Sequence, residues 1–370
     1  MKKILFLIHD LGPGGAEKVL VNLVNNMDQS KFDISLTVLF GGGVNERFLK
    51  PHIRYRAVFP KPFRGNSHLM KLFSPETLHR WLVKERYDIE VSYLEGPCAR
   101  IISGCSDPDT KLAAWIHCTV DTAGKLAGPF RSGKEAAVCY GRFDRRIFVS
   151  EGVRQAFLAQ CPLSGPSAVL YNTMETDRIL EAGRGPVAEG LFLPNRIYLC
   201  GMGKLTANKG FDRLLRIHGR LRAEGYPVHT CILGQGEGRM ALNRYIRENR
   251  LSDSVTMLGY QTNPYPFLVR CDLFICSSHS EGFSTAAAEA LILGVPVCTV
   301  AVAGMAEMLG SGNEWGLVTE NDEEALYRGI RGLLDDPALL AQYKEQAARR
   351  GRMFCMEHTV SKVEEMLESL

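Results

Sequence analysis

The sequence predicts an α/β protein built from two domains, each with a parallel sheet covered by helices. The chain has 370 residues, which exceeds the usual size of a single domain. Short apolar runs typical of buried strands recur along it, and glycine-rich loops that lead into amphipathic helices follow several of these runs. Strands that alternate with helices in this way favour parallel sheets.

The first domain is expected to span residues 1–185. An apolar strand at 3–8 runs into a glycine loop and then a helix over 18–27, which is the start of a Rossmann-like unit. The stretch 59–70 is basic and irregular, and we expect acceptor contacts there. Further strands are predicted at 33–40, 87–92, 111–117, 143–149 and 169–172, with helices at 75–86 and from Ser150 onward.

Residues 186–195 lack periodicity and are predicted to form a linker. The second domain then covers 196–355, and the chain ends in a helix within 356–370. Strands of the second domain are predicted at 197–200, 228–233, 255–260, 271–276 and 296–300, with helices at 212–224, 285–294, 322–334 and 337–350.

The composition is that of an ordinary soluble globular protein, with 45% hydrophobic and 23% charged residues. No apolar run is long enough to cross a bilayer, and the run Ile4–Ile8 is too short for a signal peptide, so we expect a cytoplasmic protein. The eleven cysteines are scattered without a C-x-x-C spacing. This favours reduced thiols over disulfides or structural zinc, and we expect no cofactor and no protein-bound metal.

The net charge of +3 is unevenly distributed. Residues 1–185 hold 25 Lys+Arg against 19 Asp+Glu (+6), and the remainder hold 19 against 22 (−3). A basic first half is compatible with an anionic acceptor or with peripheral contact with an anionic membrane, although such an excess is also common on a solvated surface. We expect no nucleic-acid partner.

The chain is organised around the stretch Ser280–Pro296, which reads S-E-G-F-S-T-A-A-A-E-A-L-I-L-G-V-P. It lies between two predicted strands, so it forms a loop and a helix, with Ser284 or Thr285 as N-cap and Gly294 at the C′ position. Free N–H groups at a helix N-terminus attract anions such as a diphosphate. Glu281 and Glu289 flank this turn; in isolation both would more often be solvated surface residues.

The surrounding residues E-G-F-S-T-A-A-A-E-A-L-I-L-G-V-P-V resemble the signature of the retaining, nucleotide-sugar-dependent glycosyltransferases of family four. The resemblance implies the GT-B architecture, in which two Rossmann-like domains face each other across a cleft and the last helix often packs back on the first domain. It also implies that Glu281 faces the transferred sugar and that Glu289 holds the nucleotide ribose. Gly282, Phe283, Ser284 and Thr285 would then bind the diphosphate through backbone amides.

The first glycine loop contains G-G-A-E at Gly14–Glu17, which matches the same family letter for letter. There the loop closes over the donor diphosphate, so the resemblance implies this role for Gly14 and Gly15; a plain tight turn is the other interpretation. A dinucleotide-binding dehydrogenase would need an acidic residue after the second strand, where Gly41–Gly43 stands instead.

Lys204 and Lys209 flank the loop after strand 197–200, where two ammonium groups could neutralise a diphosphate leaving group without a metal. The resembling family usually has arginine in place of Lys204. A lysine cannot form the bidentate fork of an arginine, so the phosphate geometry there is less defined. The family places the nucleotide base near the loops that contain Gly234 and Tyr260.

His117 ends the strand 111–117, at the sheet edge where open α/β sheets bind ligands. A histidine at such a position is often structural, but the resemblance places a histidine beside the transferred sugar. We therefore expect Glu281 and His117 to orient the sugar and the other named residues to bind the donor.

The resemblance implies a retaining transferase, and the two lysines suit one that works without a metal ion. It would use a nucleotide sugar, with UDP-sugars favoured, and a glycan or lipid-linked acceptor in cell-surface polysaccharide biosynthesis. Two alternatives remain: an inactive sugar-nucleotide-binding scaffold subunit, and a nucleotide-sugar 2-epimerase.

Overall fold

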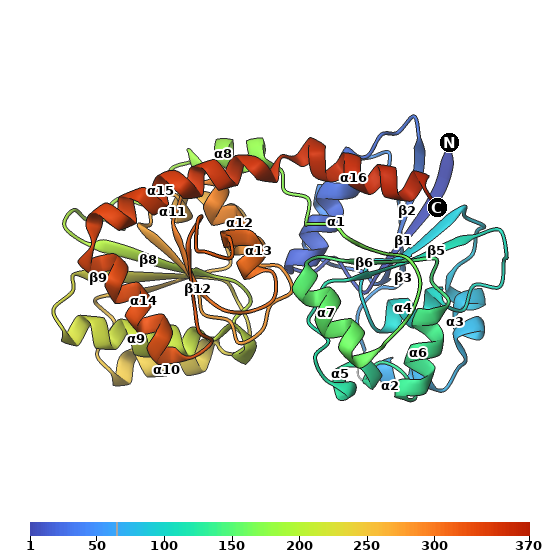
Figure 1. Cartoon of the computed structure of the whole chain (residues 1–370), viewed down its shortest axis with the longest axis horizontal. Coiled ribbons are helices and arrows are strands. Elements are labelled where there is room, and N and C mark those ends of the chain that lie inside the picture. Colours follow the sequence, from blue (N-terminus) through green and yellow to red (C-terminus); the bar gives the residue numbers. More distant parts are fainter. Residues whose placement is uncertain (64–65) are drawn as a thin grey trace. The chain divides into compact units, whose positions relative to one another are not determined.

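The computed structural model describes residues 1–63 and 66–370 and divides into two compact units (Figure 1). Unit 1 comprises Met1–Thr173 together with Met356–Leu370, and unit 2 comprises Met174–Cys355. Each unit holds one parallel sheet with helices on both faces, which confirms the predicted α/β class.

Unit 1 contains a seven-stranded parallel sheet of order β3-β2-β1-β4-β5-β6-β7. Its central strands are buried on both faces, which explains their continuous apolar sequence. The edge strand β3 was not predicted, because its side chains are mostly exposed and leave no apolar run to detect. The strands are β1 (Lys2–Ile8), β2 (Phe32–Phe40), β3 (Arg54–Phe59), β4 (Ile89–Ser92), β5 (Lys111–Ile116), β6 (Arg145–Phe148) and β7 (Ser167–Val169).

Several helices of unit 1 begin at capping residues; Ser74, Ser132 and Ser150 each accept a hydrogen bond from a first-turn amide. In Figure 1, α1 and α16 lie on one face of the sheet and α3, α4 and α6 on the other. The helices are α1 (Gly15–Asn26), η1 (Glu46–Phe48), α2 (Asn66–Lys71), α3 (Pro75–Leu82), α4 (Pro97–Ile102), α5 (Ala123–Ala127), α6 (Gly133–Gly141), α7 (Glu151–Gln160) and α16 (Met356–Glu368).

The stretch 59–70, predicted to be irregular, contains helix α2 in its second part. That prediction was wrong from Asn66 onward, because a helix of six residues has too little periodicity to detect. Residues 64–65 lie outside the described residues.

The sheet of unit 2 has six parallel strands in the order β10-β9-β8-β11-β12-β13. Its core includes Leu199, Leu214, Ile232, Leu273 and Ile330, which the strands and helices contribute in alternation. The strands are β8 (Ile197–Met202), β9 (Val228–Leu233), β10 (Val255–Gly259), β11 (Leu273–Cys276), β12 (Val297–Val300) and β13 (Leu317–Thr319).

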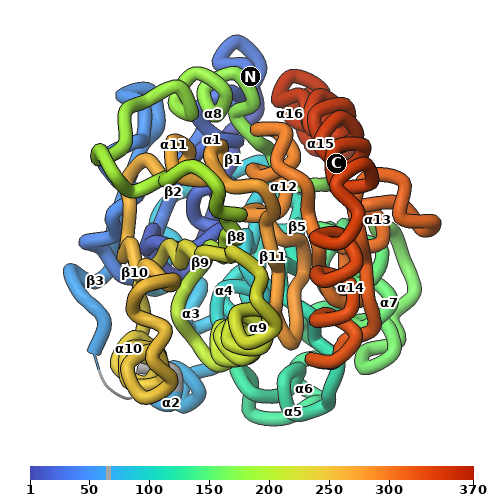
Figure 2. The backbone as a smooth tube through the Cα atoms, turned by 90° about the vertical axis from the view of Figure 1, so that its left-hand side faces the viewer, coloured from blue at the N-terminus to red at the C-terminus, as the bar shows by residue number. Residues whose placement is uncertain are grey.

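Figure 2 looks onto unit 2 and shows α9 and α10 on one face of its strands, with α11 and α12 on the other. The helices are α8 (Thr176–Gly183), η2 (Ala207–Lys209), α9 (Phe211–Ala223), α10 (Arg239–Glu248), α11 (Tyr265–Leu268), α12 (Thr285–Ile292), α13 (Met305–Leu309), α14 (Glu323–Asp335), α15 (Pro337–Gly351) and η3 (Arg352–Phe354).

The boundary between the units differs from the predicted one. The first unit ends at Thr173 rather than at residue 185, because helix α8 packs on α11 and α12 and therefore belongs to unit 2. Residues 186–195, predicted to be a linker, lie within unit 2. The C-terminal segment belongs to unit 1, where the Lys2 ammonium group donates to the carbonyls of Leu367 and Glu368 (3.1 and 3.0 Å).

In each sheet the order in which the chain adds strands reverses at one place. This switch point lies between β1 and β4 in unit 1 and between β8 and β11 in unit 2. At such a place the loops that follow the two strands diverge to opposite faces and leave a crevice, where open α/β sheets bind ligands. Residues that follow β1, β4, β8 and β11 are therefore the natural candidates for a site.

Within the described part of the chain, no helix is long and apolar enough to span a membrane.

Candidate functional site

The predicted site residues divide between the two units. Gly14, Gly15 and His117 follow strands of unit 1, whereas the others belong to unit 2, where most of them follow β8 or β11. We describe each set within its own unit.

The loop after β11 ends at helix α12, whose N-terminus forms as predicted. Ser284 is the N-cap residue, and its hydroxyl accepts a hydrogen bond from the Ala287 amide, which settles the choice between Ser284 and Thr285. Gly294 adopts a left-handed conformation (φ 72°) just past the helix, as expected for a C′ residue. Phe283 is buried, and its ring packs edge-on against Phe354 (6.3 Å between centroids). Its side chain thus anchors the turn that presents Gly282, Ser284 and Thr285.

Glu281 and Lys209 form the central ion pair of unit 2. The Lys209 Nζ atom lies 2.6 Å from Glu281 Oε1, and the Ser278 hydroxyl donates to the same oxygen (2.5 Å). The Glu281 side chain is only 9% exposed, which weakens screening of the pair by water. A carboxylate in this position is therefore held in one orientation by a cation and a hydroxyl.

The loops after β8 and β11 are joined by direct hydrogen bonds, although they lie about 70 residues apart in sequence. Asn208 accepts from the His279 amide through its carbonyl (2.7 Å) and donates from its side chain to the Ser280 carbonyl (2.8 Å). The buried Arg213 guanidinium donates to the carbonyls of Ser277 and Ser278 (2.7 and 2.8 Å). These contacts place Lys209 beside Glu281.

Gly210 makes this close approach possible. It has φ 62°, and a Cβ atom at this position would lie 2.1 Å from the Ser277 carbonyl oxygen. Any other residue would push the two loops apart. Asn208, Gly210 and Arg213 were not predicted as site residues, since none carries a spacing that points to Ser277–Ser280.

Three further predicted residues follow strands of the unit 2 sheet, and their roles are less defined: Lys204, Gly234 and Tyr260. Lys204 is exposed, in contrast to the half-buried Lys209. The Gly234 amide donates to the Gly259 carbonyl (2.8 Å), and a Cβ on Gly234 would lie 1.8 Å from the Gly203 carbonyl oxygen. This glycine therefore allows two loops to pack closely. Tyr260 directly follows β10 and is 39% exposed. Their contacts with a donor stay predictions.

Glu289 lies in the second turn of α12 and is 4% exposed. The hydroxyl of the buried Tyr265 donates to its Oε1 atom (3.0 Å). A buried carboxylate that already accepts one hydroxyl proton has the chemistry needed to accept others, such as those of a ribose. Tyr265 was missed in the sequence because it lies 24 residues away in another helix.

In unit 1, Gly14 is the N-cap of α1 and Gly15 is its first residue. The carboxylate of Glu17 covers this turn, since a Cβ on Gly14 would lie 2.0 Å from Glu17 Oε2. A diphosphate bound at these amides would meet that negative charge. The predicted role of Gly14 and Gly15 therefore implies that the Glu17 side chain moves when the donor binds.

His117 directly follows β5, and its backbone amide donates to the Glu95 carboxylate (2.9 Å). Its ring lies against Tyr93 (4.7 Å between centroids). Burial lowers the pKa of His117 to about 3, so the imidazole is neutral near pH 7. Among the described residues, its Nε2 atom has no hydrogen-bond partner. A neutral imidazole suits hydrogen bonding to a sugar hydroxyl better than proton donation.

Comparison with known proteins identifies the families that the two units resemble. Residues 13–178 match Glycosyltransferase Family 4, and residues 188–350 match Glycosyl transferases group 1. The chain is 25% identical over 362 residues, 96% of each chain, to N-acetylgalactosamine-N,N'-diacetylbacillosaminyl-diphospho-undecaprenol 4-alpha-N-acetylgalactosaminyltransferase of Campylobacter jejuni. It is 24% identical to an uncharacterized glycosyltransferase of Haemophilus influenzae, with 98% of each chain covered.

Solved structures show the same fold. The Anabaena protein HepE in complex with UDP has a TM-score of 0.78 at 20% identity, with 100% of each chain covered. WaaG, a glycosyltransferase involved in lipopolysaccharide biosynthesis, has a TM-score of 0.75 at 15% identity, with coverage of 98% and 99%. The two parallel-sheet units thus have the GT-B architecture.

Proposed function

The chain belongs to the family 4 glycosyltransferases, and from this we propose that it transfers a sugar from a UDP-sugar to a glycan or lipid-linked acceptor, with retention at the anomeric carbon and without a metal ion. The observation that carries the proposal is the pair Lys209–Glu281, which lies in the loops next to the N-terminus of α12. The cation and the backbone amides at this helix N-terminus suit a diphosphate, and the carboxylate suits the sugar.

The reaction then needs little proton transfer by the protein. The bond between the anomeric carbon and the diphosphate oxygen breaks, and its electron pair stays on that oxygen. The acceptor hydroxyl oxygen bonds to the anomeric carbon on the same face, and its proton passes to the departing phosphate oxygen. Lys204, Lys209 and the amides of Ser284 and Thr285 would stabilise the leaving group, while Glu281 would stabilise an oxocarbenium-like state.

Two relatives support the choice of substrates. HepE was crystallised with UDP and with UDP-glucose, and the Campylobacter jejuni enzyme is named for a diphospho-undecaprenol-linked saccharide acceptor. By analogy with these two relatives, we propose that this chain uses a UDP-sugar as donor and a lipid-linked saccharide as acceptor in cell-surface polysaccharide biosynthesis.

The proposal is tested by thermal shift and by release of nucleoside diphosphate, with UDP-, GDP- and ADP-sugars in the presence of a chelator. We expect one or more UDP-sugars to raise the melting temperature and to release UDP slowly. Added lipid-linked saccharide should accelerate the release. Binding of a donor without release or transfer would support the inactive scaffold instead, and an epimerised donor without acceptor would identify an epimerase.

A lipid-linked acceptor also implies contact with a membrane surface, for which unit 1 offers an exposed apolar group. Leu69 and Leu72 are 47% and 71% exposed, and Trp81 on the next helix is 48% exposed. Arg131 donates to the carbonyls of Lys71 and Leu72 (2.5 and 2.8 Å), so a cation lies beside them. Apolar side chains next to cations suit an anionic interface.

We expect the protein to co-sediment with phosphatidylglycerol vesicles and less with phosphatidylcholine vesicles. The double substitution Leu69→Asp and Leu72→Asp should reduce this binding by about tenfold or more, because two apolar contacts are lost and two negative charges are added. Met240→Asp is the matched control, since Met240 is 81% exposed on α10 of unit 2. Equal loss in the control, or no binding by the wild type, would contradict this contact.

A further inference from the structure

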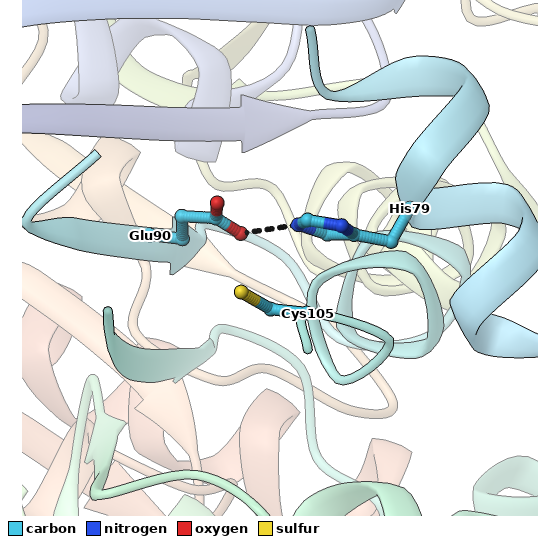
Figure 3. A group of neighbouring side chains, drawn as sticks. All are labelled: His79, Glu90 and Cys105. Atoms are coloured by element: carbon cyan, nitrogen blue, oxygen red, sulfur yellow. Dashed lines mark hydrogen bonds and ion pairs between the residues drawn. The ribbon is translucent and has the colours of Figure 1, made fainter. Parts of the chain in front are cut away.

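Three side chains with metal-binding atoms meet on the α3 and α4 face of the unit 1 sheet (Figure 3). His79 comes from α3, Glu90 from β4, and Cys105 from the turn that follows α4. Each has one ligand atom within 4.8 Å of those of the other two. Figure 3 shows the Cys105 sulfur beside the hydrogen bond between His79 and Glu90.

The cluster is almost entirely buried, and its geometry calls for a cation. The Glu90 side chain is 2% exposed, and His79 Nε2 lies 2.8 Å from its Oε2 atom. A buried carboxylate is costly unless a positive charge compensates for it.

An ion pair between His79 and Glu90 would by itself compensate the charge of the carboxylate. It would not explain why the Cys105 thiol lies beside them. Imidazole, thiolate and carboxylate together are the ligand types that Zn²⁺ selects. Around one tetrahedral zinc ion, ligand atoms are separated by about 3.3 to 3.7 Å, so the widest separation here would have to close by about 1 Å. The His79 side chain is 14% exposed, which leaves a route for the ion from solvent.

We propose that His79, Glu90 and Cys105 bind one Zn²⁺ ion. Glu90 is the second residue of β4 and lies before the strand's carboxyl end. The site is thus distinct from the loops that hold the transferase residues, and its role is structural, since the ion would tie α3 and the α4–β5 turn to the middle of the sheet. The three residues come from separate elements and share no ligand spacing in the sequence.

The test uses Co²⁺ as a spectroscopic probe of the metal-depleted full-length protein. To remove the more accessible thiols, all variants carry Cys118→Ala and Cys355→Ala. We expect one equivalent of Co²⁺ to produce a thiolate-to-cobalt charge-transfer band, Zn²⁺ to abolish the band by displacement, and Zn²⁺ to raise the melting temperature. Cys105→Ala should lose the band and the melting shift, whereas Cys161→Ala, a cysteine of the same unit that is also buried, should retain both.

His79→Gln and Glu90→Gln test the other two ligands and should each weaken Zn²⁺ binding at least tenfold. If either variant misfolds, far-UV circular dichroism will show it. The comparison of Cys105→Ala with Cys161→Ala then decides whether the cluster binds the metal. No charge-transfer band in the parent, or a band that survives Cys105→Ala, would overturn the proposal and leave the cluster as a buried ion pair with a neighbouring thiol.

Discussion

Replacing Glu281 by glutamine is expected to lower kcat about a thousandfold while changing the donor KM by less than about tenfold. The carboxylate is held by Lys209 Nζ and the Ser278 hydroxyl and is almost buried, so its negative charge acts in a poorly screened environment. A thousandfold loss corresponds to about 4 kcal/mol of transition-state stabilisation. Glutamine keeps the shape but not the charge. Steady-state kinetics at varied donor concentration measures kcat and the donor KM separately.

Ser278→Ala is the matched control for this prediction. It removes one hydrogen bond to Glu281 Oε1 and keeps the charge, so we expect a loss of only about tenfold in kcat. Melting temperatures of both variants show whether the fold is intact. If Glu281→Gln retains most of its kcat with a normal melting temperature, Glu281 has no role in stabilising the reacting sugar.

Replacing Glu289 by alanine is expected to raise the donor KM by about 10- to 100-fold with little change in kcat. A hydrogen bond to a charged group contributes about 1.5 to 3 kcal/mol, which corresponds to this range of affinity. The buried carboxylate accepts from the Tyr265 hydroxyl, so alanine also leaves that hydroxyl without its partner. We therefore expect a lower melting temperature as well. Titration of UDP by calorimetry measures the binding loss directly.

Tyr265→Phe separates the structural effect from donor binding. It removes the hydroxyl that donates to Glu289 and keeps the carboxylate. We expect a change in donor KM of less than about threefold, because the predicted ribose contact is made by the carboxylate and not by the tyrosine. A large fall in kcat with an unchanged KM in Glu289→Ala would argue against a role in ribose binding.

Much of the local structure could be predicted from the sequence. The N-cap at Ser284 or Thr285, the C′ glycine Gly294 and the buried central strands depend on neighbouring residues and on hydrophobic periodicity. Elements with weak local signals were missed or misplaced. The edge strand β3 is mostly exposed, α2 is six residues long, and α8 joins unit 2 through contacts with α11 and α12.

The candidate site shows the same division. The spacing of Glu281 and Glu289 and their place around a helix N-terminus are evident from the chain, since all of these lie within one loop and one helix. The side chains that contact these two glutamates are not evident from the chain. Lys209 lies 72 residues before Glu281, and Tyr265 lies 24 residues before Glu289. Neither pairing has a periodicity that could be detected in a single sequence.

The sequence by itself determined two α/β units, a central helix that begins at Ser284 or Thr285, and the two glutamates that flank its start. Only the tertiary structure decided that Lys209 meets Glu281, and that His79, Glu90 and Cys105 meet behind the sheet of unit 1. The physical reason is that hydrogen bonding and periodic burial act between near neighbours in sequence, whereas the order of strands in a parallel sheet brings together loops that the chain keeps far apart.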